Sequence, residues 1–256
     1  MSYFSYFSYL SHVILIIIFV FIGCAEKEID PKDPKKSFAI VKEPFDDGYY
    51  ERAITKLGEF KSRFPYSQYT AEAELLIADA QFKLDKYPES AASYEQFIKL
   101  HPKHPRADYA QFQIGQSYWE SAPDDIDREQ DYTQKALTEW KKLLEKYPTS
   151  DLSAKAKELI AKGQRRLAEA SEFIAEFYCK KEIYHACAYR FMKILDKFPE
   201  YPDIRKNALK KVVFALEKVA QKKDLDPSSD KNLFFKTMSA EQIREKAETF
   251  KKLQDT

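Results

Sequence analysis

The apolar residues of this chain follow a pattern that occurs four times at the same phase. The positions twelve, eight, five and one residues before four prolines carry first a small residue and then mostly large apolar ones: Ala53, Leu57, Phe60 and Phe64 before Pro65; Ser90, Tyr94, Phe97 and His101 before Pro102; Ala136, Trp140, Leu143 and Tyr147 before Pro148; and Cys187, Phe191, Ile194 and Phe198 before Pro199. Steps of four, three and four residues lie on one stripe of an α-helix. Each stripe therefore predicts a helix with one packed face, which ends at the proline because proline disfavours a helical residue before it.

A second helix is expected after each proline. Alanine lies eight residues after the first three prolines and isoleucine twelve residues after them, at Ala73, Ala110 and Ala156 and at Ile77, Ile114 and Ile160. The fourth copy is shifted by one, to Ala208 and Val212, because an extra residue separates Pro199 from the next helix. The small residue, the large residue four later and the proline twelve later are similar to the second helix of a tetratricopeptide repeat.

These patterns predict an all-α fold, an α-solenoid of about five tetratricopeptide-like helix pairs that forms one elongated body. The expected repeats are about 37–65, 68–102, 105–148, 151–199 and 203–255. A long first helix at 151–179 and a loop insertion at 122–130 distinguish individual repeats. The last helix is expected to begin with a capping box at Ser239 and Gln242. Its apolar stripe comprises Ile243, Ala247, Phe250 and Leu253.

The composition narrows the possible functions. The chain has 42 basic and 41 acidic residues, a net charge of +1, which argues against a dedicated nucleic-acid binder. Its four histidines are scattered, and it has no Gly-rich phosphate loop, no His-Glu-x-x-His motif and no clustered Cys/His spacing. Carboxylates three or four residues apart on repeat helices are expected to be solvated. We therefore expect no enzymatic activity, no cofactor and no metal site.

The first 24 residues differ in composition from the rest. They contain no Asp, Glu, Lys or Arg, and their apolar run from Val13 to Ile22 suits the core of a signal peptide. The run ends at Phe21-Ile22-Gly23-Cys24, which resembles a bacterial lipobox and predicts cleavage after Gly23 and lipidation of Cys24. The expected segments are a signal peptide at 1–23, a tether at 24–36 and the solenoid at 37–256. The alternative is an uncleaved anchor from about Tyr3 through Cys24.

Two further cysteines flank the turn of the fourth repeat. Cys179 and Cys187 would be able to form a disulfide in an oxidising compartment. Cys187 also occupies the position that holds a small packed residue in the other copies, Ala53, Ser90 and Ala136. The repeat pattern favours this packing role, and the disulfide is the alternative.

The chain as a whole resembles the BamD family, the lipoprotein subunit of the β-barrel assembly machinery of the Gram-negative outer membrane. The resemblance runs from Cys24 to the last helix, and it rests on Asp47-Gly48 with Arg52-Ala53-Ile54, Arg63-Phe64-Pro65-Tyr66-Ser67, Phe97 to Pro105, Asp108-Tyr109 with Gly115, Asp127-Arg128, and Tyr147-Pro148-Thr149-Ser150. The loop before Asp127 is shorter than in many members of the family.

The resemblance implies an outer-membrane lipoprotein scaffold that faces the periplasm and has two kinds of partner. Its C-terminal repeats would bind periplasmic domains of the barrel-forming assembly protein, and its N-terminal repeats would receive unfolded outer-membrane proteins. Further lipoproteins are additional candidate partners, and the lipid anchor would provide the membrane contact. The alternative is another tetratricopeptide lipoprotein adaptor, such as a secretin or pilus pilotin or an organiser of cell-wall enzymes.

Candidate binding residues follow from position and chemistry. Tyr69, Asp108, Tyr109 and Tyr118 lie on first helices or where these begin, and tyrosine offers a broad apolar face with a hydroxyl, which suits an extended segment of variable sequence. Their alternative role is to fill gaps between repeats. Arg205 and Lys206, in a basic run with Lys210 and Lys211, are candidates for steering an acidic partner domain. Trp140 is expected to be a buried packing residue of the third repeat.

Overall fold

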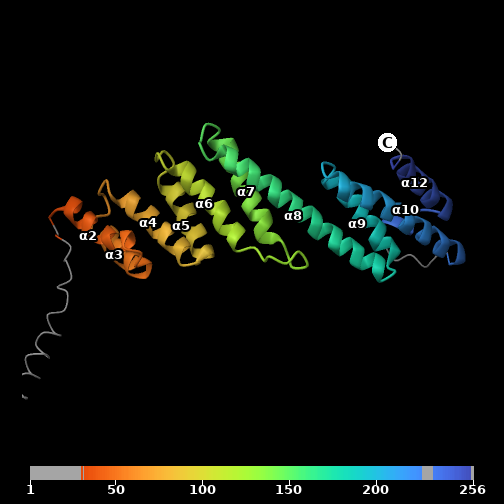
Figure 1. The fold of residues 1–256 in the computed structure, drawn as a ribbon, viewed down its shortest axis with the longest axis horizontal. Helices are drawn as coiled ribbons and strands as arrows, with labels where there is room; N and C mark the ends of the chain where they lie inside the picture. Colours follow the sequence, from red (N-terminus) through yellow and green to blue (C-terminus); the bar gives the residue numbers. More distant parts are fainter. Residues whose placement is uncertain (1–29, 31, 227–232, 255–256) are drawn as a thin grey trace, which may run out of the picture. The chain divides into compact units, whose positions relative to one another are not determined.

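The computed structural model describes residue 30, residues 32–226 and residues 233–254, and all regular structure in them is helical. Cys24 and the predicted signal peptide lie outside these residues. The chain divides into two compact units, Met1–Ala80 and Gln81–Thr256. The expected all-α class is confirmed, and so is the tetratricopeptide-like packing of consecutive helices (Figure 1).

The described part of the first unit contains α2 (Pro34–Asp46), α3 (Tyr50–Arg63) and most of α4 (Thr70–Lys83). Gly48 lies in the turn between α2 and α3 with a φ of 81°, a conformation that glycine adopts without a steric cost. The core of this unit has completely buried side chains from each helix, including Val41, Phe60 and Ala73. The small and large positions of the first predicted stripe, Ala53 and Leu57, are also completely buried.

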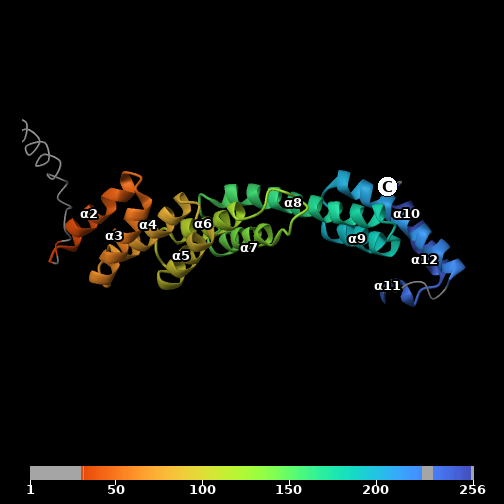
Figure 2. The same cartoon turned by 90° about the horizontal axis from the view of Figure 1, so that it is seen from below.

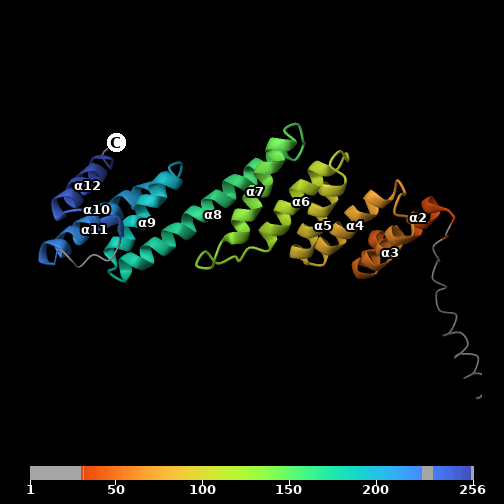
Figure 3. The same ribbon diagram turned by 180° about the vertical axis from the view of Figure 1, so that it is seen from behind.

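The second unit packs its helices in chain order. They are α5 (Tyr87–Leu100), α6 (Ala107–Glu120), α7 (Asp131–Lys146), α8 (Ser153–Lys180), α9 (Tyr184–Lys197), α10 (Pro202–Leu225), α11 (Leu233–Lys236) and α12 (Ala240–Lys252). Figures 1 and 3 show from opposite sides that α6 lies beside α7 and α9 beside α10. Each helix except the short α11 therefore buries one face against its neighbours in sequence.

The predicted stripes are the buried faces of α5, α7 and α9. Tyr94, Trp140 and Phe191 occupy the shared large position, and all three are completely buried. The residue before each proline leaves the helical region, with ψ between 53° and 58° at His101, Tyr147 and Phe198. The pattern thus predicted both the packed face and the end of each helix.

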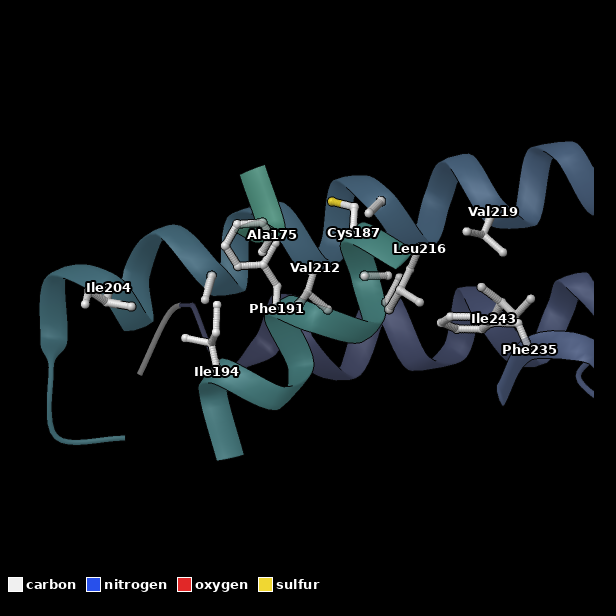
Figure 4. Packing of buried hydrophobic residues seen from close by; sticks show 14 of the residues in the cluster. Ala175, Cys187, Phe191, Ile194, Ile204, Val212, Leu216, Val219, Phe235 and Ile243 are labelled. Atoms are coloured by element: carbon white, nitrogen blue, oxygen red, sulfur yellow. The ribbon is translucent and has the colours of Figure 1, made fainter. Parts of the chain in front are cut away.

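The C-terminal helices form one core with α8 and α9. Figure 4 shows Cys187 and Phe191 of α9 packed with Val212 and Leu216 of α10, and Ile243 of α12 lies in the same cluster. The predicted capping box is present, because the Ser239 side chain accepts from the backbone of Gln242 and the Gln242 side chain accepts from the backbone of Ser239.

Two details differ from the predictions for this end of the chain. Leu253 is 41% exposed and does not extend the packed stripe, because α12 ends at Lys252. The short helix α11 was not predicted. It carries the buried Phe235, and the buried Lys223 of α10 donates from Nζ to the Phe235 carbonyl at 2.6 Å (α11 is labelled in Figure 2).

Candidate binding surfaces

Tyr109 lies on a partly accessible face of α6, and one side of its ring meets the buried Tyr94 of α5 edge-on, with ring centres 6.3 Å apart. Residues 109, 113, 116 and 120 share this face because an α-helix turns about 100° per residue, and none of the four is buried. The Gln113 amide donates to the Tyr109 hydroxyl at 2.9 Å, and the Arg106 guanidinium lies 4.6 Å from the ring centre of Tyr109. Gln116 donates in the same way to Glu120 at 2.6 Å. This outer face of α6, defined by Tyr109, Gln113, Gln116 and Glu120, presents an aromatic ring among amide and carboxylate groups.

Tyr118 lies on the opposite side of α6, because nine residues after Tyr109 correspond to about two and a half helical turns. Its hydroxyl donates to Glu95 of α5 at 2.9 Å, and its ring lies 6.2 Å from that of Tyr132 on α7. Burial, followed by the hydrogen bond to Glu95, raises the pKa of Tyr118 to about 12. The structure therefore places Tyr118 between α5 and α7 and does not bring it together with Tyr109.

Asp108 holds the beginning of α6 against the turn before α8. One carboxylate oxygen accepts from the Ser150 hydroxyl at 2.6 Å, and the other accepts from the backbone N–H of Tyr109 at 2.8 Å. Burial and, second, the charge of Asp108 raise the pKa of Tyr147 in the same turn. Asp108 thus fixes the backbone that carries Tyr109.

Tyr69 belongs to the first unit and lies immediately before α4. Its ring stacks on Phe38 of α2, with ring centres 5.2 Å apart and an angle of 16° between the planes. Tyr69 is half-buried at the edge of the core of that unit. Its position matches the gap-filling role that the sequence left open.

Arg205 and Lys206 lie in the first turns of α10. Lys206 is exposed and Arg205 is half-buried. Part of the surrounding basic run is engaged with α8, because Lys211 pairs with Glu176 at 2.7 Å. Lys206 therefore remains accessible to a partner, whereas Lys211 is committed to packing α10 on α8.

A groove between α8 and α9, which no sequence pattern indicated, carries three cations. Ile174 and Tyr178 of α8 and Tyr189, Arg190, Lys193 and Lys197 of α9 line it, together with Ser171, Ala186, Ile194 and Phe198. We call this surface the α8–α9 groove. Its apolar residues are partly accessible, since Ile174 is 38% and Tyr189 37% exposed.

The three cations of the α8–α9 groove lie over aromatic rings. Arg190 is 4.6 Å from the ring centre of Tyr178, Lys193 is 5.8 Å from that of Tyr189, and Lys197 is 5.2 Å from that of Phe198. In the part of the chain that the structure describes, none of the three forms an ion pair with a carboxylate. The groove therefore combines uncompensated positive charge with an accessible apolar surface, which suits an acidic protein surface.

Among residues 30, 32–226 and 233–254, no group of three or more His, Cys, Asp or Glu side chains is arranged to hold a metal ion. Within the same ranges, no helix has both the length and the apolar character needed to cross a membrane.

A protein-family model and several known proteins are similar to this chain over most of its length. The protein-family model YfiO, described as an outer membrane lipoprotein, matches residues 30–231. The outer membrane protein assembly factor BamD of Vibrio cholerae is 25% identical over 199 residues, which cover 73% of this chain and 83% of that protein. Its counterpart in Neisseria meningitidis serogroup A is 28% identical over 173 residues, covering 64% of this chain and 65% of that protein. Among solved structures, the TPR2AB-domain:pHSP90 complex of yeast Sti1 aligns with a TM-score of 0.45 and 14% identity over 86% of this chain and 84% of that chain.

Proposed function

Because the chain belongs to the YfiO family of outer membrane lipoproteins, which includes the assembly factor BamD, we propose that it is a scaffold with two separate protein-binding surfaces. The family confirms the outer-membrane location and the role in outer membrane protein assembly that the sequence predicted. It also confirms the expected lack of enzymatic activity, since these proteins are non-enzymatic assembly factors. The partners and the residues that bind them are the proposal.

The first proposed surface is the α8–α9 groove, which binds a periplasmic domain of the barrel-forming assembly protein. The observation that carries this proposal is the set of three groove cations, each held over a ring and none paired with a carboxylate. A guanidinium or ammonium group already positioned by a ring loses less conformational freedom when it meets a carboxylate. Arg205 and Lys206 on α10 provide further positive charge for the same acidic partner.

The second proposed surface is the outer face of α6, which receives unfolded outer-membrane proteins. Tyr109 can contact apolar and aromatic side chains of an extended segment, while Gln113 and Gln116 can exchange hydrogen bonds with its backbone. Such contacts do not require one particular sequence. Asp108 supports this face by fixing the start of α6, and Tyr118 is proposed to hold α6 in place between α5 and α7. Tyr69 is proposed as a separate contact residue within the first unit.

The anchor in this proposal is Cys24. The lipobox-like segment Phe21-Ile22-Gly23-Cys24 lies outside the described residues, and lipidation of Cys24 accords with the lipoprotein family. Several acyl chains on one residue give durable attachment, whereas one chain alone gives only marginal binding.

Charge reversal tests the first surface. The triple variant Arg190→Glu, Lys193→Glu, Lys197→Glu should weaken binding of the assembly protein's periplasmic domains by at least about tenfold, because each cation becomes a repulsive carboxylate. The matched control is Lys99→Glu, Lys103→Glu, Lys141→Glu, which makes the same charge change at exposed positions away from the groove. Affinities measured by titration calorimetry at two salt concentrations separate a local effect from net charge. An equal loss in both triple variants, or no loss in the groove variant, would reject the groove as the docking surface.

A further inference from the structure

A disulfide joins the two helices that form the α8–α9 groove. Cys179 in the last turn of α8 and Cys187 in the first turn of α9 are bonded, with Cα atoms 5.0 Å apart. Cys187 belongs to the same core cluster as Val212 and Leu216 of α10, which are labelled near it in Figure 4. Cys187 is completely buried and Cys179 is half-buried. Cys187 is therefore both a packed core residue and a partner in a disulfide. The prediction that favoured packing without a disulfide was wrong.

The disulfide lies beside the residues that line the groove. Tyr178 immediately precedes Cys179, and Ala186 immediately precedes Cys187, and both line the groove. Tyr178 also provides the ring under the Arg190 guanidinium. The bond thus fixes the end of α8 relative to the first turn of α9, and with it the position of Tyr178 relative to Arg190.

The helices do not depend on the disulfide for their pairing. In the turn between them, the N–H of Ile183 donates to the Tyr178 carbonyl and that of Glu182 to the Cys179 carbonyl, each at 3.0 Å. Phe191 and Ile194 of α9 pack in the core with residues of α10 through contacts that do not involve the sulfurs. The bond closes a short loop, so its loss increases the entropy of the unfolded chain, and lowers the stability of the fold, less than the loss of a long-range bridge would. Reduction is therefore expected to loosen the groove locally and to leave the unit folded.

We propose that the Cys179–Cys187 disulfide is a redox-dependent cross-link that holds the α8–α9 groove in its binding geometry, so that partner docking is strongest in the oxidised protein. This inference rests on the proposed function, since the groove is the docking surface. It makes the affinity of the scaffold for its partner depend on oxidative folding.

The chemistry is thiol–disulfide exchange. On oxidation, the two thiols lose two protons and two electrons to the disulfide of an oxidised dithiol protein, which becomes a dithiol. On reduction, an external thiolate attacks Sγ of the half-buried Cys179, because Cys187 is inaccessible, and Cys187 leaves as a thiolate and takes up a proton. A second thiolate then releases Cys179 from the mixed disulfide. A redox sensor that switches repeatedly would have both sulfurs at the surface. Because Cys187 is completely buried, this bond is expected to form once and to persist in an oxidising compartment.

The test compares oxidised full-length protein, the same protein reduced with a phosphine, and the double variant Cys179→Ser, Cys187→Ala. The partner is the purified periplasmic domains of the assembly protein, and the expected result is an affinity about three- to tenfold weaker for both the reduced protein and the double variant. The phosphine should have no further effect on the double variant. Binding of an unfolded outer-membrane protein peptide should be the same in all three, because the outer face of α6 is unaffected. Equal partner affinity in all three forms would overturn the proposal.

Hydrogen exchange of residues 183–190 provides a second measurement that needs no partner. Faster exchange there in the reduced protein, with unchanged exchange in α6 and α7, supports the cross-link as the element that fixes the groove. Unchanged exchange throughout overturns it. If neither form binds the periplasmic domains, the proposed docking function fails, and the exchange data still decide whether the disulfide sets the groove geometry.

Discussion

Gly115 of α6 and Trp140 of α7 are in such close contact that a side chain on Gly115 has no room. A Cβ at Gly115 would lie 2.4 Å from Nε1 and 2.6 Å from Cδ1 of Trp140. The same indole N–H donates to the Phe112 carbonyl at 3.2 Å, which holds the ring across α6. The absence of a Cβ therefore allows the two helices to approach each other across the largest buried side chain of the unit.

Substituting Gly115 with alanine should consequently destabilise the protein, although alanine is the better helix former. The forced movement of a completely buried indole should cost about 1–3 kcal/mol of unfolding free energy, measured by urea denaturation. Gly58→Ala is the matched control, because Gly58 lies inside α3 and a Cβ there would meet nothing within 4 Å. That substitution should be neutral or stabilising by up to about 1 kcal/mol. Equal effects of the two substitutions would show that the Gly115–Trp140 contact is not tight.

Truncating the other partner tests the same packing from the opposite side. Trp140→Ala should lower the free energy of unfolding by about 3–5 kcal/mol, because it removes a completely buried indole and leaves a cavity between α6 and α7. The measurement is the urea midpoint at constant slope. A midpoint within error of the parent protein would contradict the assignment of Trp140 to the packed position of its repeat.

The helix pairs could be predicted because stripes such as the one that contains Trp140 and Leu143 are periodic, and periodicity is a local property of the sequence. The α8–α9 groove could not, because Arg190 becomes distinctive only when Tyr178 of another helix lies beneath it. Spacing alone would have placed Tyr109 and Tyr118 on opposite sides of their helix, since nine residues correspond to about two and a half turns. The disulfide was only the less favoured alternative, because a small buried position is compatible with a free or a bonded Cys187.

The contact between Tyr118 and Glu95 predicts how stability changes at high pH. Burial and the bond to Glu95 raise the pKa of the folded phenol to about 12, above the value of about 10 expected for an unfolded chain. Its contribution to stability is thus complete below about pH 10 and is lost as the pH rises from 10 towards 12. Tyrosine-labelled NMR, assigned with Tyr118→Phe, should show a lower pKa for Tyr118 in Glu95→Gln. An unchanged value in that variant would mean that Glu95 does not contribute.

The amino terminus of the mature protein should be lipidated Cys24, because the apolar run ends there and a charged segment begins immediately afterwards. Mass spectrometry of the membrane-bound protein should find residues 1–23 removed and acyl groups on Cys24. In Cys24→Ala, the protein should lose this modification. Recovery of a peptide that extends unbroken through residues 1–24 would instead support an uncleaved anchor.

Site-specific photo-crosslinking in membranes can distinguish two separate surfaces that bind two different partners. Photoreactive residues would replace Tyr109 on the outer face of α6 and Lys193 in the α8–α9 groove, and Lys141 on α7 would be the exposed control. Position 109 should capture unfolded outer-membrane proteins, position 193 should capture the barrel-forming assembly protein, and position 141 should capture neither. Capture of both partners at both of the first two positions, or of neither partner at either, would contradict the assignment of the two partners to separate surfaces.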